Sequence, residues 1–295
     1  MAALPGPSPD LASAARSLGI LSRLLAPMSA YDYRPKPEIE TLLAGLRQRI
    51  LPIFTLEGAA RETLKDRIAA AGALGQGGDP RLDTDTFIPL PGCPGVALGK
   101  YPVTVQEFAG FIEAGGYDDF ELWSPEGWQA LQQAKWAAPA SWESQTGHPN
   151  RPVTGISWYE AEAWCRWASR QGGHTVRLPT AEEWRQAAMP DEQLYPWGYA
   201  EPDAERANFN RNVGGPTPVG VYPAGNGPLG HCDLAGNVWE WGEELAGQPV
   251  GPGAGRVLHG GSWISAQNVR AASRRRAHPA NRYNSLGFRC SRVQS

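Results

Sequence analysis

The feature that most constrains the fold is a series of short glycine–aromatic motifs in the last third of the chain. The sequence is Gly-Asn-Val-Trp-Glu-Trp over residues 236–241, Gly-Gly-Ser-Trp over 260–263 and Leu-Gly-Phe-Arg over 286–289. The 22 residues at 264–285 differ from these motifs, because they hold few apolar side chains and many arginines. A polar segment fixed at both ends by rigid motifs is typical of a surface that a scaffold displays.

The composition is that of a globular chain with a sizeable core and many loops. Hydrophobic residues make up 41% of the 295 positions and include twelve tryptophans, which argues against disorder. Thirty-five glycines and 27 prolines follow no period, so a loop-rich fold is favoured over a fibrous one. The net charge of −3 argues against general binding to polyanions, and we do not expect nucleic acid as a partner.

The cysteines and the termini indicate a cytoplasmic protein. Four cysteines at positions 93, 165, 232 and 290 lie far apart, which excludes a zinc ribbon and a thioredoxin-type motif and favours buried free thiols. The N-terminus lacks the charged, apolar and small-residue regions of a signal peptide, and no apolar run has membrane-spanning length. We therefore expect a cytoplasmic location and no membrane partner.

Two parts of the chain differ in pattern. Residues 1–80 predict a helical N-terminal extension, with apolar residues at helical spacing over 10–24, 37–50 and 56–74 and a glycine-rich end at 75–80. Residues 81–295 predict an α+β domain of short antiparallel strands and a few capped helices. A hairpin is expected over 87–98, and capping boxes at Ser157–Glu160 and Thr180–Glu183 predict two helix starts.

Many short motifs in register identify a family resemblance over roughly residues 84–292. Beyond those above, they are Lys-Tyr-Pro-Val-Thr (100–104), Arg-Pro-Val (151–153), Ser-Trp-Tyr-Glu-Ala (157–161), Arg-Leu-Pro-Thr-Ala-Glu-Glu-Trp (177–184), Tyr-Pro-Trp-Gly (195–198), Pro-Val-Gly (218–220) and Asp-Leu-Ala (233–235). Together they resemble the formylglycine-generating-enzyme (sulfatase-modifying factor) domain, a variant of the C-type lectin fold. The resemblance implies that fold for residues 81–295, but it does not by itself establish a function.

The ligands of the two oxidative chemistries in this family are not found in the sequence. The oxidising enzymes use a copper-binding cysteine pair after the Gly-Gly-Ser motif, where Ser265 stands here. A serine hydroxyl lacks the soft thiolate that Cu(I) requires. The sulfoxide-synthase relatives bind a non-haem iron through a histidine-rich motif, whereas the five histidines here are scattered. We therefore expect that the chain is not an enzyme.

The segment at 264–285 resembles a different branch, the variable proteins of diversity-generating retroelements. In those proteins the stretch between Gly-Gly-Ser-Trp and Gly-Phe-Arg is diversified and binds ligand. The resemblance implies a receptor-like protein whose unknown ligand, expected to be a protein, contacts the 264–285 surface. The candidate variable residues are Ile264, Ser265, Ala266, Ser273, Arg275, Ala277, Tyr283, Asn284 and Ser285. An enzyme of the sulfatase-modifying type, or a non-haem iron oxidative enzyme, with altered ligands is the alternative.

The turn around Gly236 is a candidate metal site. In the resembled enzymes a structural calcium is held by residues that align with Asp233, Gly236, Val238 and Glu240, and calcium prefers several hard oxygen ligands. Two alternatives compete with calcium. The two acids could accept hydrogen bonds from backbone amides, or Glu240 could pair with an arginine, whose planar fork suits a buried carboxylate. No organic cofactor is expected.

Overall fold

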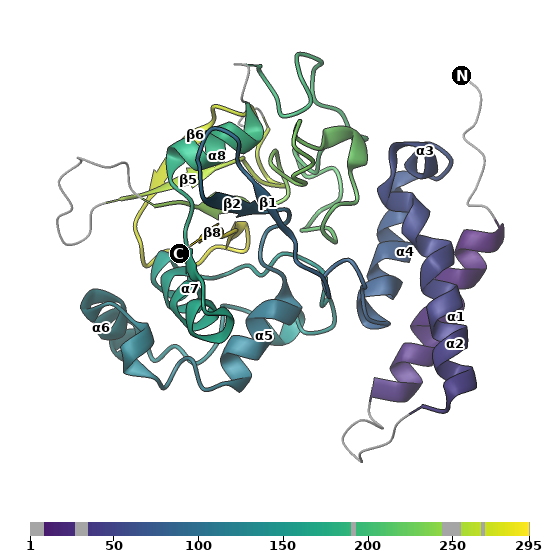
Figure 1. Cartoon of the computed structure of the whole chain (residues 1–295), viewed down its shortest axis with the longest axis horizontal. Coiled ribbons are helices and arrows are strands. Elements are labelled where there is room, and N and C mark those ends of the chain that lie inside the picture. The colour runs from purple at the N-terminus through teal and green to yellow at the C-terminus, as the bar shows by residue number, and fades with distance from the viewer. Residues whose placement is uncertain (1–8, 27–34, 190–192, 244–254, 267–268, 295) are drawn as a thin grey trace.

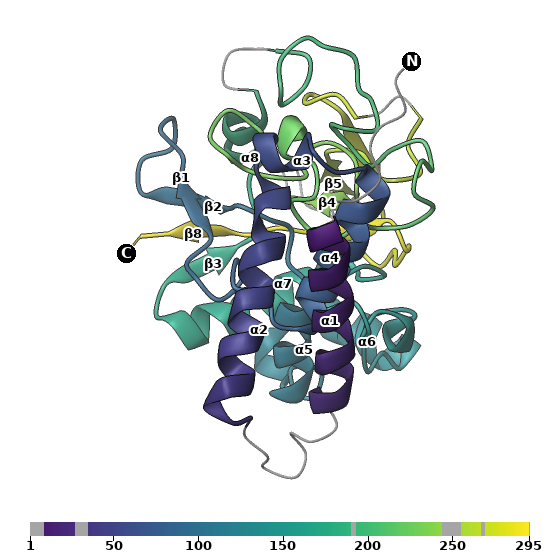
Figure 2. The same ribbon diagram turned by 90° about the vertical axis from the view of Figure 1, so that its right-hand side faces the viewer.

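The computed structural model describes residues 9–26, 35–189, 193–243, 255–266 and 269–294. Long N-terminal helices stand along one side of the molecule, and a mixed domain of short strands, helices and loops forms the rest (Figure 1). Turned by 90°, these helices cross the front of the mixed domain (Figure 2). Within the described ranges, no helix has the length and apolar character needed to cross a membrane.

The N-terminal helices pack on one another through leucine and alanine side chains. They are α1 (Pro9–Leu25), α2 (Pro37–Ile50), the one-turn α3 (Leu56–Ala59) and α4 (Leu64–Gln76), with a 3₁₀ turn at Leu51–Phe54. Helix α1 contacts both α2 and α4. The single helix predicted over 56–74 is wrong, because Thr63 accepts a hydrogen bond from the amide of Asp66 and starts a new helix there.

The helices attach to the mixed domain through buried contacts. Val221 and Tyr222 of the domain belong to the apolar cluster of α1, α2 and α4. Arg67 on α4 is almost fully buried, and it donates to the carbonyl of Val221 at 3.1 Å and pairs with Glu205. Asn150 donates to the carbonyl of Ala71 at 2.8 Å. The helical part and the mixed domain therefore share a core and are not joined by a linker alone.

The first sheet confirms the predicted hairpin. Its strands follow the order β1-β2-β8-β3, all antiparallel, with bounds β1 (Phe87–Pro89), β2 (Val96–Gly99), β3 (Thr175–Arg177) and β8 (Ser291–Val293). The C-terminal strand β8 is central, so the end of the chain closes the sheet whose hairpin begins the domain.

The second sheet carries the glycine–aromatic motifs. Its order is β6-β5-β4-β7, with bounds β4 (Trp239–Trp241), β5 (Arg256–His259), β6 (Arg274–Ala277) and β7 (Leu286–Phe288). Strands β4 and β7 are parallel, which differs from the antiparallel strands expected. The parallel pair places both motif strands side by side, while β6 from the polar segment lies at the edge.

Four helices and two 3₁₀ turns cover the first sheet and the aromatic core. The helices are α5 (Val105–Glu113), α6 (Pro125–Ala134), α7 (Trp158–Gly172) and α8 (Ala181–Ala188), and the turns are Phe120–Leu122 and Trp142–Ser144; a further turn, Pro223–Gly225, lies near α3. Both predicted capping boxes are confirmed at α7 and α8, and Thr104 with Glu107 makes a third at α5. The sequence prediction missed α6.

Removal of the α7 cap provides a simple stability test. Ser157 accepts from the amide of Glu160 at 3.1 Å, and the Glu160 carboxylate accepts from the amide of Ser157 at 2.7 Å. We expect Ser157→Ala to lower the free energy of unfolding by about 1 kcal/mol, because the first turn of α7 loses this acceptor. Urea unfolding followed by circular dichroism measures the loss, and an unchanged midpoint would contradict the assigned cap.

Candidate active site

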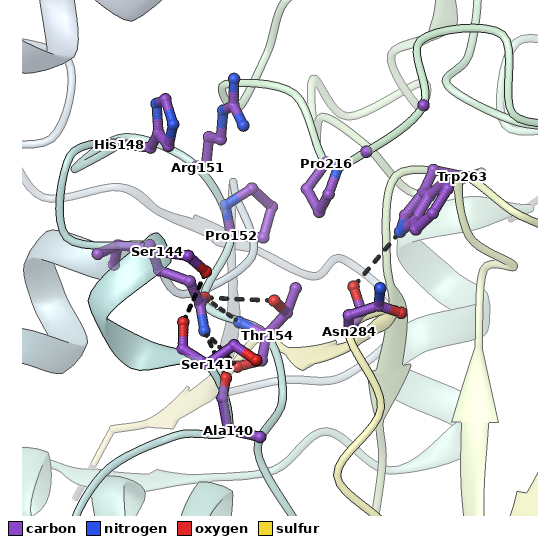
Figure 3. A pocket seen from close by; sticks show the side chains of 14 residues that line it. Ala140, Ser141, Ser144, His148, Arg151, Pro152, Thr154, Pro216, Trp263 and Asn284 are labelled. Atoms are coloured by element: carbon purple, nitrogen blue, oxygen red, sulfur yellow. Dashed lines mark hydrogen bonds between the residues drawn. The ribbon is translucent and has the colours of Figure 1, made fainter.

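A cavity of about 230 Å³ opens where three loops of the mixed domain meet (Figure 3). One wall is the 140–154 loop, a second is the 214–216 loop, and Trp263 and Asn284 form the third. The polar side chains of the lining are Ser141, Ser144, Gln145, His148, Arg151, Thr154 and Asn284. The cavity therefore combines one large aromatic side chain with several hydrogen-bonding groups, which is typical of a small-molecule site.

Gln145 holds the first wall in shape. Its amide nitrogen donates to the carbonyls of Ala140 at 3.1 Å and Thr154 at 3.0 Å. Its amide oxygen accepts from the backbone amide of Thr154 at 2.9 Å. These bonds close the 140–154 loop and use the side chain of Gln145, so the free polar groups of this wall belong to other residues.

Trp263 forms the opposite wall and is placed by the glycines before it. Gly260 and Gly261 have φ values of 86° and 77°, a conformation that other residues rarely adopt, and a Cβ on Gly260 would lie 3.0 Å from the carbonyl oxygen of Leu234. The amide of Trp263 donates to the carbonyl of Asn237 at 2.9 Å, and its indole nitrogen donates to the carbonyl of Asn284 at 3.3 Å. The last contact joins the two ends of the polar segment at the cavity.

Arg151 gives the cavity its charge, and His148 lies beside it in the lining. Burial lowers the pKa of Arg151, and burial followed by the nearby Arg151 lowers the pKa of His148. At neutral pH His148 is therefore uncharged and Arg151 is the cation of this wall. The same two side chains also line a second cavity of about 490 Å³ between α1 and α4, so they stand where the cavities meet.

The nine predicted ligand-binding residues do not share one environment. Ile264, Ala266, Arg275, Tyr283 and Asn284 are exposed, and Ser265, Ser273 and Ala277 are half-buried. Ser285 is buried, so the exposure predicted for it is wrong; the amide of Trp239 donates to its carbonyl at 2.8 Å, which ties it to β4. Only Asn284 of the nine lines the 230 Å³ cavity.

The arginines between these residues do not share one environment either. Arg282 is held by the framework, because it donates to the carbonyl of Gly155 at 3.1 Å and pairs with Glu160 at 3.0 Å. Arg270, Arg274 and Arg276 are exposed, the last two on edge strand β6. Regular spacing of these arginines therefore does not imply burial, because three of the four side chains lie at the surface.

The residues of the predicted calcium site make protein contacts instead. Both carboxylate oxygens of Glu240 accept from Arg289, at 2.5 and 2.7 Å. The Asp233 carboxylate accepts from the amide of Gly220 at 2.7 Å, and Gly236 and Val238 are buried beside it. The arginine pairing considered for Glu240 thus accounts for its carboxylate, and this arrangement does not fit a calcium ion.

Asp233 leads to a pH-dependent prediction. Burial raises the pKa of its carboxyl from 3.8 to about 6. Between those values the unfolded chain loses the proton first, so the free energy of unfolding falls as pH rises, by roughly 3 kcal/mol in total. Asp233→Asn keeps an acceptor for Gly220 and should gain stability over the parent from about pH 4 to about pH 6 and no further above. Urea unfolding at several pH values measures this, and a pH-independent difference would contradict it.

The histidines do not fit the iron site of the sulfoxide-synthase relatives. Among the residues that the structure describes, no three histidine, cysteine or acidic side chains come together in a metal-binding group. His148 alone lines the cavity, while His231 and His259 are buried and their burial lowers each pKa to about 3. No catalytic step is therefore assigned to a metal held by these residues.

Comparison with known proteins identifies the family to which the chain belongs. Residues 87–294 match the model of the sulfatase-modifying factor enzyme 1-like domain. The chain belongs to this family. Its mixed domain has the α+β, C-type lectin-like fold of the formylglycine-generating-enzyme type, as the motifs predicted. In this member of the sulfatase-modifying factor family, the fold consists of two short sheets and the capped helices α5, α7 and α8.

Several curated proteins are similar to this family member. Hercynine oxygenase of Mycolicibacterium smegmatis is 31% identical, over 85% of the chain and 68% of its own length. Hercynine oxygenase of Mycobacterium tuberculosis is 35% identical, over 70% of the chain and 55% of its own length. Formylglycine-generating enzyme of Thermomonospora curvata is 31% identical, over 66% of the chain and 80% of its own length.

These relatives overturn the expectation that the chain is not an enzyme. All three are named as enzymes, and the two oxygenases are similar over most of the chain. The missing cysteine pair and histidine motif exclude two sets of metal ligands, but they do not exclude catalysis. The expectation is wrong because those two ligand sets are not the only route to an active site.

One of two similar solved structures supports the fold. The structure of PvdO from Pseudomonas aeruginosa superposes with a TM-score of 0.52 at 19% identity, covering 68% of this chain and 80% of that one. Variable protein 1 of Treponema denticola gives a TM-score of 0.48 at 23% identity, covering 68% and 84%. The first likeness bears on the fold alone, and the second, with a TM-score below 0.5, carries no argument.

Sequence analysis missed His148, Arg151 and the rest of the 140–154 loop as site residues. A signal was present, because residues 144–159 hold a histidine and an arginine but no acidic residue. Such an unbalanced loop in a chain with more acids than bases indicates a site for an anionic group.

Proposed function

We propose that this chain is an oxidative enzyme of the sulfatase-modifying factor family, related to the hercynine oxygenases. The extent of the similarity is the observation that carries the proposal. The family model begins at residue 87, whereas the Mycolicibacterium smegmatis oxygenase matches 85% of the chain, so the match must extend into the N-terminal helices. The formylglycine-generating enzyme matches 66%. This difference favours an oxygenase of the hercynine type.

The geometry supports the 230 Å³ cavity as the place where substrate binds. It is smaller than the roughly 300–1,000 Å³ of drug-sized sites, so it suits a compound of about amino-acid size. Trp263 offers an aromatic face, Asn284 an amide and Ser141 a hydroxyl for orienting such a compound (Figure 3). The second cavity, between α1 and α4, adjoins at His148 and Arg151, which gives the N-terminal helices a part in the site.

The oxidising group is the part that the described residues do not supply. The oxygenase resemblance implies a non-haem iron, which would supply the activation of dioxygen. Because the described residues form no three-ligand cluster, we assign them only substrate binding and orientation. Trp263 and Asn284 would fix the position of the substrate, and the walls around them would limit its access to water.

Oxygen consumption tests the proposal. The purified chain, supplied with ferrous iron and a thiol as reductant, should consume dioxygen faster when hercynine is added, and mass spectrometry should detect an oxidised product. We expect Trp263→Ala to lower the rate roughly tenfold or more, because the substrate loses an orienting wall. Trp197→Ala is the matched control, since Trp197 lies outside this cavity and stacks on Tyr195 at 5.2 Å. No hercynine-dependent consumption by the parent chain would overturn the proposal.

Display of a diversified surface by residues 264–285 is a second proposal. The exposure of Ile264, Ala266, Arg275, Tyr283 and Asn284 supports it, and the burial of Ser285 counts against it. A position that must accept many residue types cannot be close-packed. The genome provides the test: a nearby reverse-transcriptase gene and an adenine-rich near-copy of the 3′ end are expected, and their absence would remove the support.

A further inference from the structure

We infer that Arg151 binds the anionic group, a carboxylate or a phosphate, of a small ligand held where the two cavities meet. This inference rests on the proposed function for the location of the ligand, and it adds the chemical class that the site selects. Arg151 and His148 are the two residues that line both the cavity beside Trp263 and the cavity between α1 and α4. A ligand in either cavity would therefore meet the guanidinium group.

The charge of Arg151 has no counterion among the residues that the structure describes. No carboxylate oxygen of those residues lies within 4.0 Å of its guanidinium, and its buried Nε has no hydrogen-bond partner. Only its backbone is held: the amide donates to the carbonyl of His148 at 3.1 Å, and the carbonyl accepts from Val105 at 2.9 Å. Arg151 is half-buried, so its charge is partly removed from water, and an anionic partner from outside the chain would stabilise it.

Four shielded arginines of the described residues pair with a carboxylate: Arg67 with Glu205, Arg81 with Asp79, Arg282 with Glu160 and Arg289 with Glu240. Half-buried Arg47 instead donates to the carbonyl of Gly77 at 2.7 Å. The guanidinium of Arg151 has neither kind of acceptor among the described residues, and Arg151 lies where two cavities adjoin. This difference indicates that its carboxylate or phosphate arrives with a ligand.

The surroundings favour an anion as well. Arg16 and Arg23 line the cavity between α1 and α4 together with Arg151, and Asp66 is the one acid in that lining. The Asp66 carboxylate accepts from the hydroxyl of Thr63 at the start of its own helix, at 2.5 Å. The lining therefore holds three arginines and one acid whose carboxylate is already engaged, and the planar fork of arginine suits carboxylates and phosphates in particular.

Three probes that share one ring test the inference by calorimetry. Phenylacetate carries a carboxylate, phenyl phosphate a phosphate, and phenylacetamide neither, while the ring can lie against Trp263 in each. We expect the intact chain to bind at least one of the two anions roughly tenfold or more tightly than the amide. Whichever anion binds more tightly identifies the ligand as a carboxylate or a phosphate.

Substitutions then assign the binding to Arg151. Arg151→Gln should abolish the preference for the anion over the amide, and Arg151→Lys should keep part of it because the charge remains. Arg166→Gln is the matched control, since Arg166 pairs with Glu162 at 2.9 Å on α7, away from both cavities, and should leave the preference unchanged. The melting temperature of Arg151→Gln should equal or exceed that of the parent, because an unpaired cation is removed; a structural arginine would behave in the opposite way.

The outcomes separate this inference from the proposed function. Equal affinities for the acids and the amide, no binding of either acid at millimolar concentration, or an anion preference that survives Arg151→Gln would each overturn it. Hercynine turnover that Arg151→Gln does not change would contradict the inference and leave the enzyme proposal intact. Charge-dependent binding without any turnover would support the inference and contradict the enzyme proposal.

Discussion

Replacing Arg289 with alanine is expected to lower the free energy of unfolding by about 3–5 kcal/mol. Arg289 and Glu240 are both fully buried, and two hydrogen bonds at 2.5 and 2.7 Å join them. The same guanidinium donates to the backbone carbonyls of Gly99 and Cys232 at 3.1 and 2.9 Å. The variant leaves a buried carboxylate without its cation and two carbonyls without a donor, which is why the loss is large.

Urea unfolding of three proteins measures this effect. Arg289→Lys keeps the charge but cannot form the bidentate contact. Its free energy of unfolding should therefore lie between those of the parent and Arg289→Ala. Arg292→Ala is the control, because Arg292 pairs with Asp85 near the surface and such pairs contribute about 0–1 kcal/mol. A loss below about 1 kcal/mol for Arg289→Ala would contradict the stabilising role assigned to this buried pair.

Replacing Phe288 with alanine should cost a similar amount, about 3–5 kcal/mol, through a cavity. Phe288 is fully buried on β7, and its ring packs edge-on against Phe108 at 6.3 Å and Trp164 at 5.5 Å. These rings join the second sheet to helices α5 and α7, so the empty space would lie at the centre of the main core.

Two further variants check that the loss of Phe288 reflects packing. Phe288→Leu fills part of the space and should cost clearly less than Phe288→Ala. Phe120→Ala removes the same ring from an exposed site and should change stability by less than about 0.5 kcal/mol. Thermal melts and urea titrations give the values, and equal losses at positions 288 and 120 would contradict the assigned core.

Features set by neighbouring residues were predictable from the sequence. The capping boxes at Ser157 and Thr180 place both hydrogen-bonding partners within four residues, and the structure confirms both helix starts. The hairpin of β1 and β2 is likewise local, and family motifs gave the fold of the domain because their order records its topology. The helix break before Thr63 was missed because helical spacing of apolar residues continues across it.

The candidate site was harder to predict, because it depends on residues far apart in the chain. Arg151, Gly215 and Trp263 meet only in the folded domain, and the cavity also requires that Gln145 close its loop. Glu240 shows the same difficulty, since the sequence allowed both a calcium ligand and an arginine partner. The contact of Glu240 with Arg289, 49 residues away, shows that the arginine partner is the correct alternative.

A crystal structure of the chain with hercynine bound is the most direct test of the central claim that the cavity beside Trp263 is the substrate site of an enzyme. We predict that hercynine lies in this cavity, against the indole of Trp263 and within hydrogen-bonding distance of Asn284 or Arg151. Hercynine bound at another place, or absent from crystals soaked at a concentration that supports turnover, would contradict the account.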